Sequence, residues 1–364
     1  MDIDELYYDA VDLLKAMIAT KSVSHEEQAV ADVIEAAMRG YGLAVRRAGN
    51  NLWSISPDFE PAKPTILLNS HIDTVKPVAG WTRDPFTPEE SEEGALYGLG
   101  SNDAGASVVS LMGAFRYLTD HEQPCNYVFL ASCEEEVSGK NGVEKALPML
   151  PVIDVAIVGE PTQLQPAIAE KGLMVLDGEA LGVAGHAARN EGVNAIYKVV
   201  EAVERLRRVR FERDSELLGP VKVTVAQINA GTQHNVVPDR CTLVVDVRTT
   251  DASGNLATLA VLREAVGDLC TLTPRSTRLN PSGIDRGHSL VQRLVMMGKE
   301  PFGSPTLSDQ ALMPFPSLKM GPGDSARSHT ADEYIMLHEI REALHTYCTL
   351  LDGYRVCDSD RKKD

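Results

Sequence analysis

Carboxylates and a histidine stand directly after three apolar runs in the first half of the chain. They are His71 and Asp73, the three consecutive glutamates 134–136, and Glu160. The carboxyl ends of parallel strands meet at one edge of a sheet, so we expect these side chains to lie close together. Imidazole and carboxylate groups are ligands that Zn²⁺ and Co²⁺ accept in proteins. The spacing therefore predicts a metal site at this edge of a sheet.

Two residues elsewhere in the chain extend the donor set. Asp103 follows the glycine-rich segment 98–102, and His329 stands shortly before the last apolar helix pattern. Singly, these residues have ordinary structural explanations, since Asp103 is a suitable N-cap for a helix that begins at residue 104. Together, two histidines shared among more carboxylates indicate a pair of ions bridged by one carboxylate. The economical interpretation is a two-metal hydrolase.

Alternating helices and strands must position these donors. Apolar residues at helical spacing, with Ser24-x-x-Glu27 as a capping box, predict two leading helices, at 4–20 and after residue 27, and two more at 104–118 and 143–150. Short apolar runs predict strands at 44–48, 51–55, 65–69, 126–131 and 154–158. This alternation predicts an α/β fold with a mostly parallel central sheet and flanking helices.

The pattern changes near residue 171. The expected elements from there are a strand at 173–183, a helix at 193–209, strands at 221–230 and 241–249, a helix at 252–269 and a strand at 270–278. This order is that of a ferredoxin-like α+β unit. Beyond it, an apolar segment at 316–320 and a helix at 332–351 return to the first domain. We therefore predict one domain made of residues 1–170 and 280–364, with residues 171–279 inserted into it.

Composition excludes several classes of function. The 364 residues carry a net charge of −17, so the overall field would repel a nucleic-acid backbone. The start Met1–Glu5 lacks the basic and apolar parts of a signal peptide, and no apolar run approaches the length of a membrane span. The six cysteines form no Cys-x-x-Cys pair, which favours buried thiols over disulfides or a thiolate zinc site. We expect a cytoplasmic protein that binds neither nucleic acid nor membranes.

The sequence resembles the M20 family of metallopeptidases and deacylases over nearly its whole length. The motifs that carry the resemblance are, in chain order, Ser70-His71-Ile72-Asp73-Thr74-Val75, Gly98-Leu99-Gly100-Ser101-Asn102-Asp103, Glu134-Glu135, Gly159-Glu160-Pro161-Thr162 and Ser328-His329. The inserted unit is similar to the lid and dimerisation domain of that family. The resemblance thus implies a metal-dependent hydrolase and a homodimer formed through the insert.

The resemblance also implies a role for each donor. His71 and Glu160 match the terminal ligands of one ion, Glu135 and His329 match those of the other, and Asp103 matches the bridge. Two divalent ions per chain are therefore expected, with Zn²⁺ first and Co²⁺ as a substitute.

Two acidic residues match roles beside the ions. Glu134 matches the general base, and Asp73 matches the residue that orients His71, as metal-bound imidazoles require. Because the run contains three glutamates, the alternative that Glu135 and Glu136 take the roles of base and ligand stays open. The family also implies a cis peptide bond after Asp103.

Three residues of the insert match positions near the family's substrate. His186, in Gly185-His186-Ala187-Ala188-Arg189, matches a histidine that reaches the partner subunit's site and steadies the oxyanion. Asn235 matches another such position, and Arg248 is a plausible fork for a substrate carboxylate. Their ordinary explanations are a surface histidine, a turn residue and an exposed strand cation.

The function implied is hydrolysis of the amide bond of an N-acyl amino acid. Within the family the resemblance is greatest to acetylornithine deacetylases, which implies a place in arginine biosynthesis. The alternatives are a desuccinylase of succinyl-ornithine or succinyl-diaminopimelate and a di- or tripeptidase. A non-catalytic binding protein on the same fold, or a module with a single metal ion, is the alternative from another class.

Overall fold

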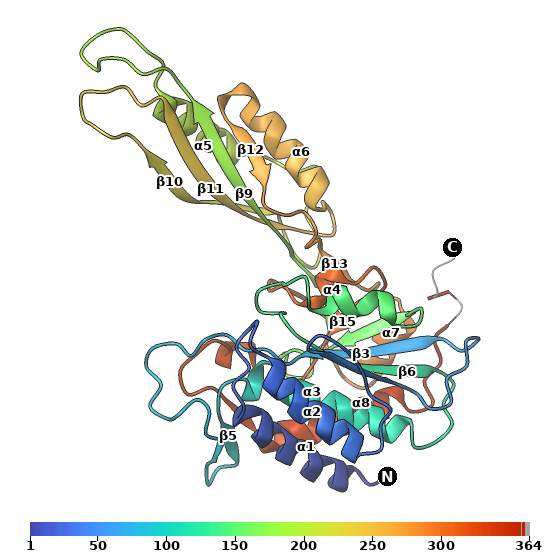
Figure 1. Ribbon diagram of the computed structural model, residues 1–364. Helices are drawn as coiled ribbons and strands as arrows, with labels where there is room; N and C mark the ends of the chain where they lie inside the picture. Colours follow the sequence, from blue (N-terminus) through green and yellow to red (C-terminus); the bar gives the residue numbers. More distant parts are fainter. Residues whose placement is uncertain (358, 361–364) are drawn as a thin grey trace. The chain divides into compact units, whose positions relative to one another are not determined.

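The computed structural model describes residues 1–357 and 359–360 and divides the chain into two compact units (Figure 1). Unit 1 comprises Met1–Ile168, Gly283–Phe302 and Ser308–Asp364, and unit 2 comprises Ala169–Ser282 and Gly303–Leu307. The insert predicted at 171–279 falls within unit 2. The short segment 303–307 also belongs to unit 2, and nothing in the sequence indicated this.

A nine-stranded sheet forms the framework of the part of the chain that carries the predicted donors. Its path is β1 (Arg46–Ala48), β2 (Asn51–Ile55), β6 (Asn126–Ser132), β3 (Thr65–His71), β7 (Val155–Val158), β15 (Ser317–Lys319), β8 (Ala167–Glu170) and β13 (Ser282–Gly283), with β14 (Phe302–Ser304) paired to β8. The central strands β6, β3, β7 and β15 run parallel, whereas β1, β2 and β8 join them antiparallel. The predicted α/β class is confirmed, with a parallel centre and antiparallel flanks.

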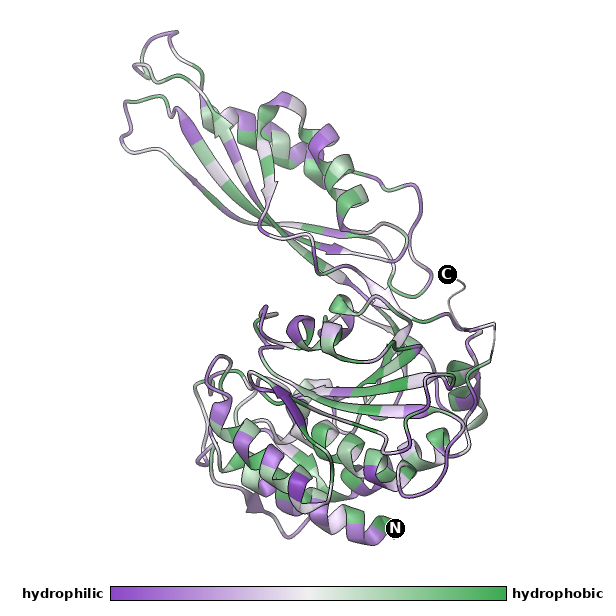
Figure 2. Ribbon diagram, turned by 45° about the vertical axis from the view of Figure 1, so that its right-hand side comes forward, coloured by the Kyte–Doolittle hydropathy of each residue, from purple (hydrophilic) through white to green (hydrophobic). Residues whose placement is uncertain are grey.

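Helices α1 (Ile3–Ile18), α2 (Gln28–Gly40), α3 (Ala106–Leu118) and α8 (Leu337–Leu351) gather on one side of this sheet (Figure 1). Helix α3 contacts β3, β6, α1 and α8, and almost all its residues are buried. Burial on every side explains why α3 is apolar around its whole circumference. Figure 2 shows the contrast between the apolar central strands and the mixed colouring of α1.

Several helix boundaries differ from the predictions. Ser24 does not cap α2, because its hydroxyl donates to Asp73 and the helix begins at Gln28 without a side-chain cap. The helix predicted at 143–150 is α4 (Val143–Ala146) followed by a 3₁₀ turn that contains Pro148. The remaining helix of unit 1, α7 (Ser289–Met296), was not predicted.

A second, three-stranded sheet also escaped the sequence analysis. It consists of β16 (Tyr334–Met336), β5 (Ala95–Tyr97) and β4 (Glu89–Glu90) in that order. The helix predicted at 332–351 includes residues 334–336, whereas the observed helix begins at Leu337. The pairing of β16 with β5 places the segment after His329 beside the segment that leads to Asp103.

Unit 2 is the predicted ferredoxin-like fold. Its sheet has the order β10 (Lys222–Ala230), β11 (Arg240–Thr249), β9 (Gly172–Leu181) and β12 (Thr271–Pro274), with all neighbours antiparallel. Helices α5 (Ala195–Arg208) and α6 (Asn255–Val266) contribute Val199, Leu206 and Leu262 to one core with apolar residues of β9 and β11. Strands β9 and β11 alternate in burial, as a sheet with a single covered face requires. Within the described residues no helix is long and apolar enough to cross a membrane.

Candidate metal centre

The predicted donors of unit 1 converge at the carboxyl ends of the central strands. His71 is the last residue of β3, and Glu160 comes two residues after the end of β7. Asp103 lies in the wide turn 101–105 that leads into α3, and the peptide bond between Asp103 and Ala104 is cis, as predicted. His329 lies in the loop between β15 and β16 with a left-handed backbone φ of 58°. The parallel centre of the sheet therefore positions His71 and Glu160, whereas a turn and a loop bring Asp103 and His329 to the same edge.

These donors form two groups that share Asp103. In the first group, His71 Nε2 lies 3.2 Å from Asp103 Oδ1 and 3.8 Å from Glu160 Oε1. In the second group, His329 Nε2 lies 3.7 Å from Asp103 Oδ2 and 3.0 Å from Glu136 Oε2. Asp103 thus turns a different oxygen toward each histidine, which is the geometry of a bridging carboxylate.

Each group fits a divalent cation. One ligand atom from each of the three residues in a group lies within 4.8 Å of the other two, as expected around an ion with bonds of about 2.0 to 2.2 Å. All donors are imidazole nitrogens or carboxylate oxygens, and no thiolate takes part. This donor set suits Zn²⁺ or Co²⁺.

The charges of the two groups are poorly balanced without cations. Burial, with repulsion from Asp103, raises the pKa of Glu160 to about 8 against the opposing effect of His71. The hydrogen bond to Glu136, with further acidic neighbours, raises the pKa of His329 to about 9. Burial also raises the pKa of Glu135 well above its ordinary value. The cluster therefore retains protons that bound cations would displace.

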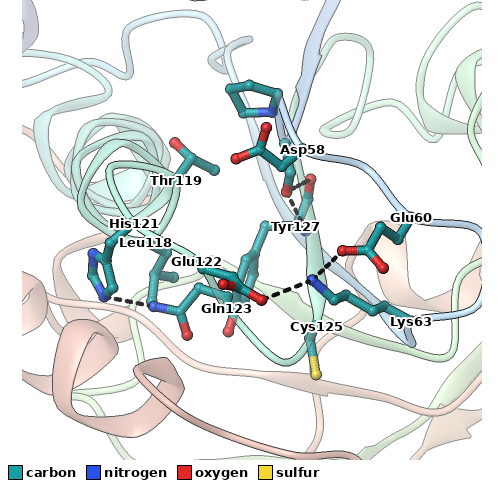
Figure 3. A pocket seen from close by; sticks show the side chains of 12 residues that line it. Asp58, Glu60, Lys63, Leu118, Thr119, His121, Glu122, Gln123, Cys125 and Tyr127 are labelled. Atoms are coloured by element: carbon teal, nitrogen blue, oxygen red, sulfur yellow. Dashed lines mark hydrogen bonds and ion pairs between the residues drawn. The ribbon is translucent and has the colours of Figure 1, made fainter.

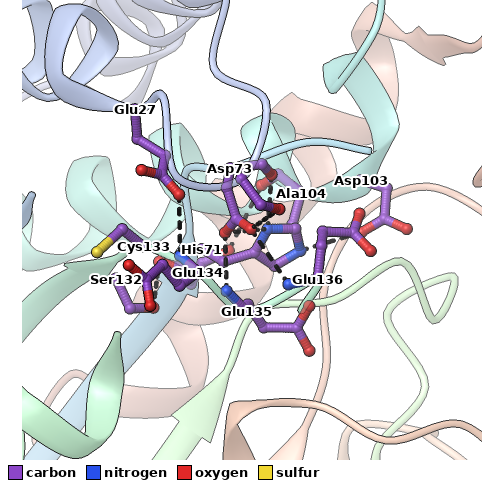
Figure 4. Close-up of polar contacts among 12 residues, drawn as sticks. Glu27, His71, Asp73, Asp103, Ala104, Ser132, Cys133, Glu134, Glu135 and Glu136 are labelled. Carbon is purple, nitrogen blue, oxygen red and sulfur yellow. Dashed lines mark hydrogen bonds and ion pairs between the residues drawn. The ribbon is translucent and has the colours of Figure 1, made fainter. Parts of the chain in front are cut away.

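The glutamate run takes a register that differs from the expected pairing. His329 contacts Glu136, whereas Glu135 was expected to lie beside it. Glu134 has a left-handed φ of 56°, which interrupts the alternation of side chains after β6. Figure 4 shows Glu134 on the side of Cys133, and Glu136 on the side of Asp103. Glu136, rather than Glu135, therefore lies beside His329 in the second group.

The Glu134 carboxylate is already engaged. It accepts the backbone N–H of Asn141 at 3.1 Å and the side-chain amide of Asn141 at 2.9 Å, and it lies 3.3 Å from His25 Nδ1. A side chain at position 139 would overlap this carboxylate, so Gly139 is required by close approach. Both oxygens of Glu134, which the sequence predicts to be the general base, thus accept hydrogen bonds from Asn141.

The Glu135 carboxylate differs from that of Glu134 in its contacts. Within the described part of the chain its carboxylate accepts no hydrogen bond, although its charge interacts with His71 and Glu160. A carboxylate with a raised pKa and a free oxygen beside a metal centre suits general-base chemistry.

Buried carboxylates hold the backbone of this run. The N–H of Glu134 donates to Glu27, and the N–H groups of Glu135 and Glu136 donate to the two oxygens of Asp73 at 3.0 and 3.2 Å. Asp73 also accepts the hydroxyl of Ser24 at 2.7 Å. Asp73 therefore fixes the segment that carries Glu135 and Glu136.

The orientation of His71 involves both the backbone and the side chain of Asp73. His71 Nδ1 lies 2.9 Å from the Asp73 carbonyl oxygen and 3.6 Å from its carboxylate. This places Nδ1 as the donor and leaves Nε2 to face Asp103. The contacts agree with the orienting role expected for Asp73, although the backbone carbonyl makes the closer one.

The three predicted residues of the insert lie in unit 2. His186 forms an isolated antiparallel bridge with Val236, and Ala187 N–H donates to the Asn235 carbonyl, so these two loops are paired. Arg248, on β11, makes two hydrogen bonds to Asp246 of the same strand. Its guanidinium fork, expected to be available for a substrate, is therefore largely occupied.

A polar pocket of about 350 Å³ lies at the other end of the central strands (Figure 3). Two of its lining side chains have ionic partners: Lys63 lies 2.6 Å from Glu60 within the lining, and His121 lies 3.0 Å from Asp352, which is not a lining residue. It lies near the starts of β3 and β6, whereas ligands of open α/β sheets bind at the carboxyl ends. We assign it no role in the chemistry.

Comparison with known proteins agrees with the site. Residues 67–353 match the profile of peptidase family M20/M25/M40. An acetylornithine deacetylase of Pectobacterium carotovorum is 27% identical over 93% of this chain and 97% of its own length. A putative succinyl-diaminopimelate desuccinylase of Mycobacterium tuberculosis is 26% identical over 96% and 99%.

Solved structures share the fold. Aminopeptidase PepT of Bacillus cereus superposes with a TM-score of 0.77 at 18% identity over 95% of this chain and 98% of its own. A dinuclear metal-binding peptidase of the M20 family from Bacillus subtilis gives 0.73 at 14% identity over 96% and 98%. With the matched profile covering most of its length, this chain belongs to peptidase family M20/M25/M40 and is a metal-dependent amide hydrolase.

Proposed function

We propose that this enzyme deacetylates N-acetylornithine, with two divalent ions per chain, in arginine biosynthesis. The observation that carries the proposal is the pair of ligand groups sharing Asp103, since one carboxylate facing two imidazoles is suited to two ions. The choice of acyl group is supported by the deacetylase from Pectobacterium carotovorum, which aligns over 93% of the chain.

We assign the ligands by geometry. His71 and Glu160 would hold one ion, Glu136 and His329 the other, and Asp103 both. The ions, Zn²⁺ or Co²⁺, supply a Lewis acid that polarises the amide carbonyl and lowers the pKa of water. This assignment moves the second glutamate ligand from position 135 to 136.

Glu135 acts as the general base in this proposal. Its free carboxylate removes a proton from the attacking water and then gives that proton to the nitrogen of the leaving amine. The support is its raised pKa, which burial causes, together with the engagement of Glu134 by Asn141 and of Glu136 by His329. Asp73 keeps both Glu135 and His71 in position.

The insert contributes to substrate binding and assembly in the same proposal. His186 would stabilise the oxyanion in the partner subunit's site, and Asn235 would bind the substrate. Arg248 would contact a carboxylate through Nη1, the nitrogen that Asp246 does not engage. A homodimer through unit 2 is supported by the position of β10 at the end of its sheet and by the 50% exposure of Ile228. Free cysteines, most of them buried, support a reducing cytoplasmic location.

A second substrate class has its own support. The relative from Mycobacterium tuberculosis is named a putative succinyl-diaminopimelate desuccinylase, and the solved neighbour from Bacillus cereus is an aminopeptidase. N-succinyl-ornithine, N-succinyl-diaminopimelate and small peptides are therefore the alternatives to N-acetylornithine. All of them use the same metal centre.

The test is amine release from a matched set of amides. The set contains N-acetylornithine, N-acetylcitrulline, N-succinyl-ornithine, N-succinyl-diaminopimelate and a dipeptide, each with Zn²⁺ or Co²⁺ and with a chelator. We expect chelator-sensitive release that is fastest with N-acetylornithine. Faster release from a succinyl compound or the dipeptide would overturn the proposed acyl group but would leave the assignment of hydrolase activity intact. A protein that binds no divalent ion would overturn the metal assignment itself.

A further inference from the structure

A buried carboxylate outside both ligand groups lies against the turn that carries the bridging residue. Glu333 is 2% exposed and immediately precedes β16. Its backbone carbonyl accepts the N–H of Gly98, which extends the pairing of β16 with β5 by one step. The ladder of the small sheet thus brings Glu333 alongside the start of the turn that contains Asp103.

The side chain of Glu333 then reaches the backbone of that turn. Its Oε1 accepts the N–H of Asn102 at 3.0 Å and the N–H of Asp103 at 2.9 Å. Two N–H groups at one carboxylate oxygen fix both the position and the orientation of the peptide units around Asp103.

The neighbouring residue Asn102 ties the same turn to the loop that carries His329. Its amide nitrogen donates to the Asp324 carbonyl at 3.1 Å and to Ser328 Oγ at 3.2 Å, and its amide oxygen accepts the Asp324 N–H at 3.0 Å. The turn and the loop are therefore joined on both sides of His329, by Asn102 before it and by Glu333 after it.

We propose that Glu333 is a positioning residue of the metal centre, which fixes the bridging carboxylate of Asp103 relative to His329. The inference rests on the proposed metal site and adds a residue that touches no ligand atom of the ions. Repulsion between the carboxylates of Glu333 and Asp103 opposes this placement. The two backbone hydrogen bonds that Glu333 accepts offset that repulsion. Outer partners of metal ligands typically change metal affinity 10- to 100-fold when removed.

Asp332 provides a matched control one residue away. Its Oδ1 accepts two consecutive backbone N–H groups, those of Thr82 at 2.9 Å and Arg83 at 3.1 Å. The two carboxylates thus make the same kind of contact, but the segment that Asp332 holds carries no metal donor. Asp332 is more exposed than Glu333 but also accepts the Thr82 hydroxyl at 2.6 Å, so its removal costs the protein a comparable number of hydrogen bonds.

The experiment measures metal affinity in the full-length protein, by competition with a chromophoric chelator and Zn²⁺. We expect Glu333→Ala to lower affinity about 10- to 100-fold, Glu333→Gln to stay within about threefold of the wild type because its amide oxygen still accepts, and Asp332→Ala to have no effect. If Glu333→Ala does not fold, Glu333→Met fills the same volume without an acceptor and replaces it.

A second readout does not depend on metal. Hydrogen exchange in the metal-free protein should become faster over residues 98–106 in Glu333→Ala and unchanged there in Asp332→Ala. Unchanged affinity and exchange in Glu333→Ala, or an equal loss of affinity in Asp332→Ala, would overturn the positioning role. Failure of the wild type to bind two ions would instead overturn the proposed metal site, so the two failures are distinguishable.

Discussion

The assignment of Glu135 rather than Glu134 as the general base gives a sharp prediction. Three single variants, Glu134→Gln, Glu135→Gln and Glu136→Gln, change one charge each and almost no volume. General-base catalysis contributes about 10²- to 10⁴-fold, or roughly 3 to 5 kcal/mol of activation free energy. We therefore expect Glu135→Gln to lose about that factor in kcat while it retains both ions.

The other two variants should behave differently because their carboxylates have other partners. In Glu134→Gln, the side-chain oxygen still accepts one hydrogen bond from Asn141. The new NH₂ group, however, faces the second Asn141 donor. The expected result is a loss of about 1 to 3 kcal/mol of folding stability, with a change in kcat below tenfold. At position 136, Gln removes a ligand charge next to His329, so about one ion per chain should be lost.

The assay is kcat for the best amide of the substrate set, with metal content and thermal melting measured on the same samples. The pattern across the three variants is more informative than any one of them, because a global defect would lower melting temperature in parallel with turnover. The reasoning would be refuted if Glu134→Gln lost turnover by 10²-fold or more with two ions and a normal melting temperature, while Glu135→Gln stayed active.

Further predictions follow from the same geometry. Replacing His329 with Ala should leave the ion at His71 and Glu160 and remove the other, seen as about one ion per chain by elemental analysis; loss of both would contradict the division into two groups. In the folded state the pKa values of Glu160 and Glu333 are about 8, above the usual 4.5, so these two carboxyl groups bind protons more tightly in the folded than in the unfolded state. Their contribution to stability is complete below about pH 4.5 and is lost as the pH rises through about 8, so chelated protein should melt at a lower temperature at pH 8.5 than at pH 6. Saturating Zn²⁺ should reduce this dependence of the melting temperature on pH. The prediction would be contradicted if the difference in melting temperature between chelated and Zn²⁺-saturated protein did not grow with pH. Gly139→Ala should destabilise the protein by about 1 to 3 kcal/mol in denaturant unfolding, because its Cβ would overlap the Glu134 carboxylate; an unchanged midpoint would show that this contact relaxes freely.

The positions of the donors were predictable because they depend on where strands end. The run Thr65–Asn69 is apolar and buried, and a parallel strand in the middle of a sheet must point its carboxyl end at the ligand edge. The same logic located Glu160 after β7. The ferredoxin-like unit was predictable for a similar reason, since its alternation of burial in β9 and β11 is visible in the residue types.

The register within the glutamate run was not predictable from residue types. Three identical side chains follow β6, and the choice among them depends on the left-handed backbone at Glu134. Such a conformation is uncommon for a residue other than glycine, and here hydrogen bonds to the backbone and side chain of Glu134 stabilise it. Glu27, 107 positions away, accepts the Glu134 N–H, and Asn141, seven positions further along the chain, donates to the Glu134 carboxylate; neither residue forms a local motif with the strand.

The small sheet was missed because its strands are only two or three residues long. β16 pairs with β5 across more than 230 positions of sequence, and its residues fall inside the helix predicted at 332–351. Missing that sheet also concealed the role of Glu333, which depends on the ladder for its place beside Gly98. Glu333 stands four residues after His329 in the sequence, but only the fold shows where its carboxylate goes.

The backbone contacts of the non-ligand carboxylates explain why this cluster should bind cations tightly. Like charges gathered at one sheet edge would normally move apart or take up protons. Here Asp73 holds the backbone of Glu135 and Glu136, while Glu333 holds that of Asp103, so the ligand segments cannot separate without breaking buried hydrogen bonds. Repulsion that movement cannot relieve can be relieved only by protons or by cations. The hydrogen bonds that fix the ligand segments therefore raise the affinity for cations, in addition to holding the fold.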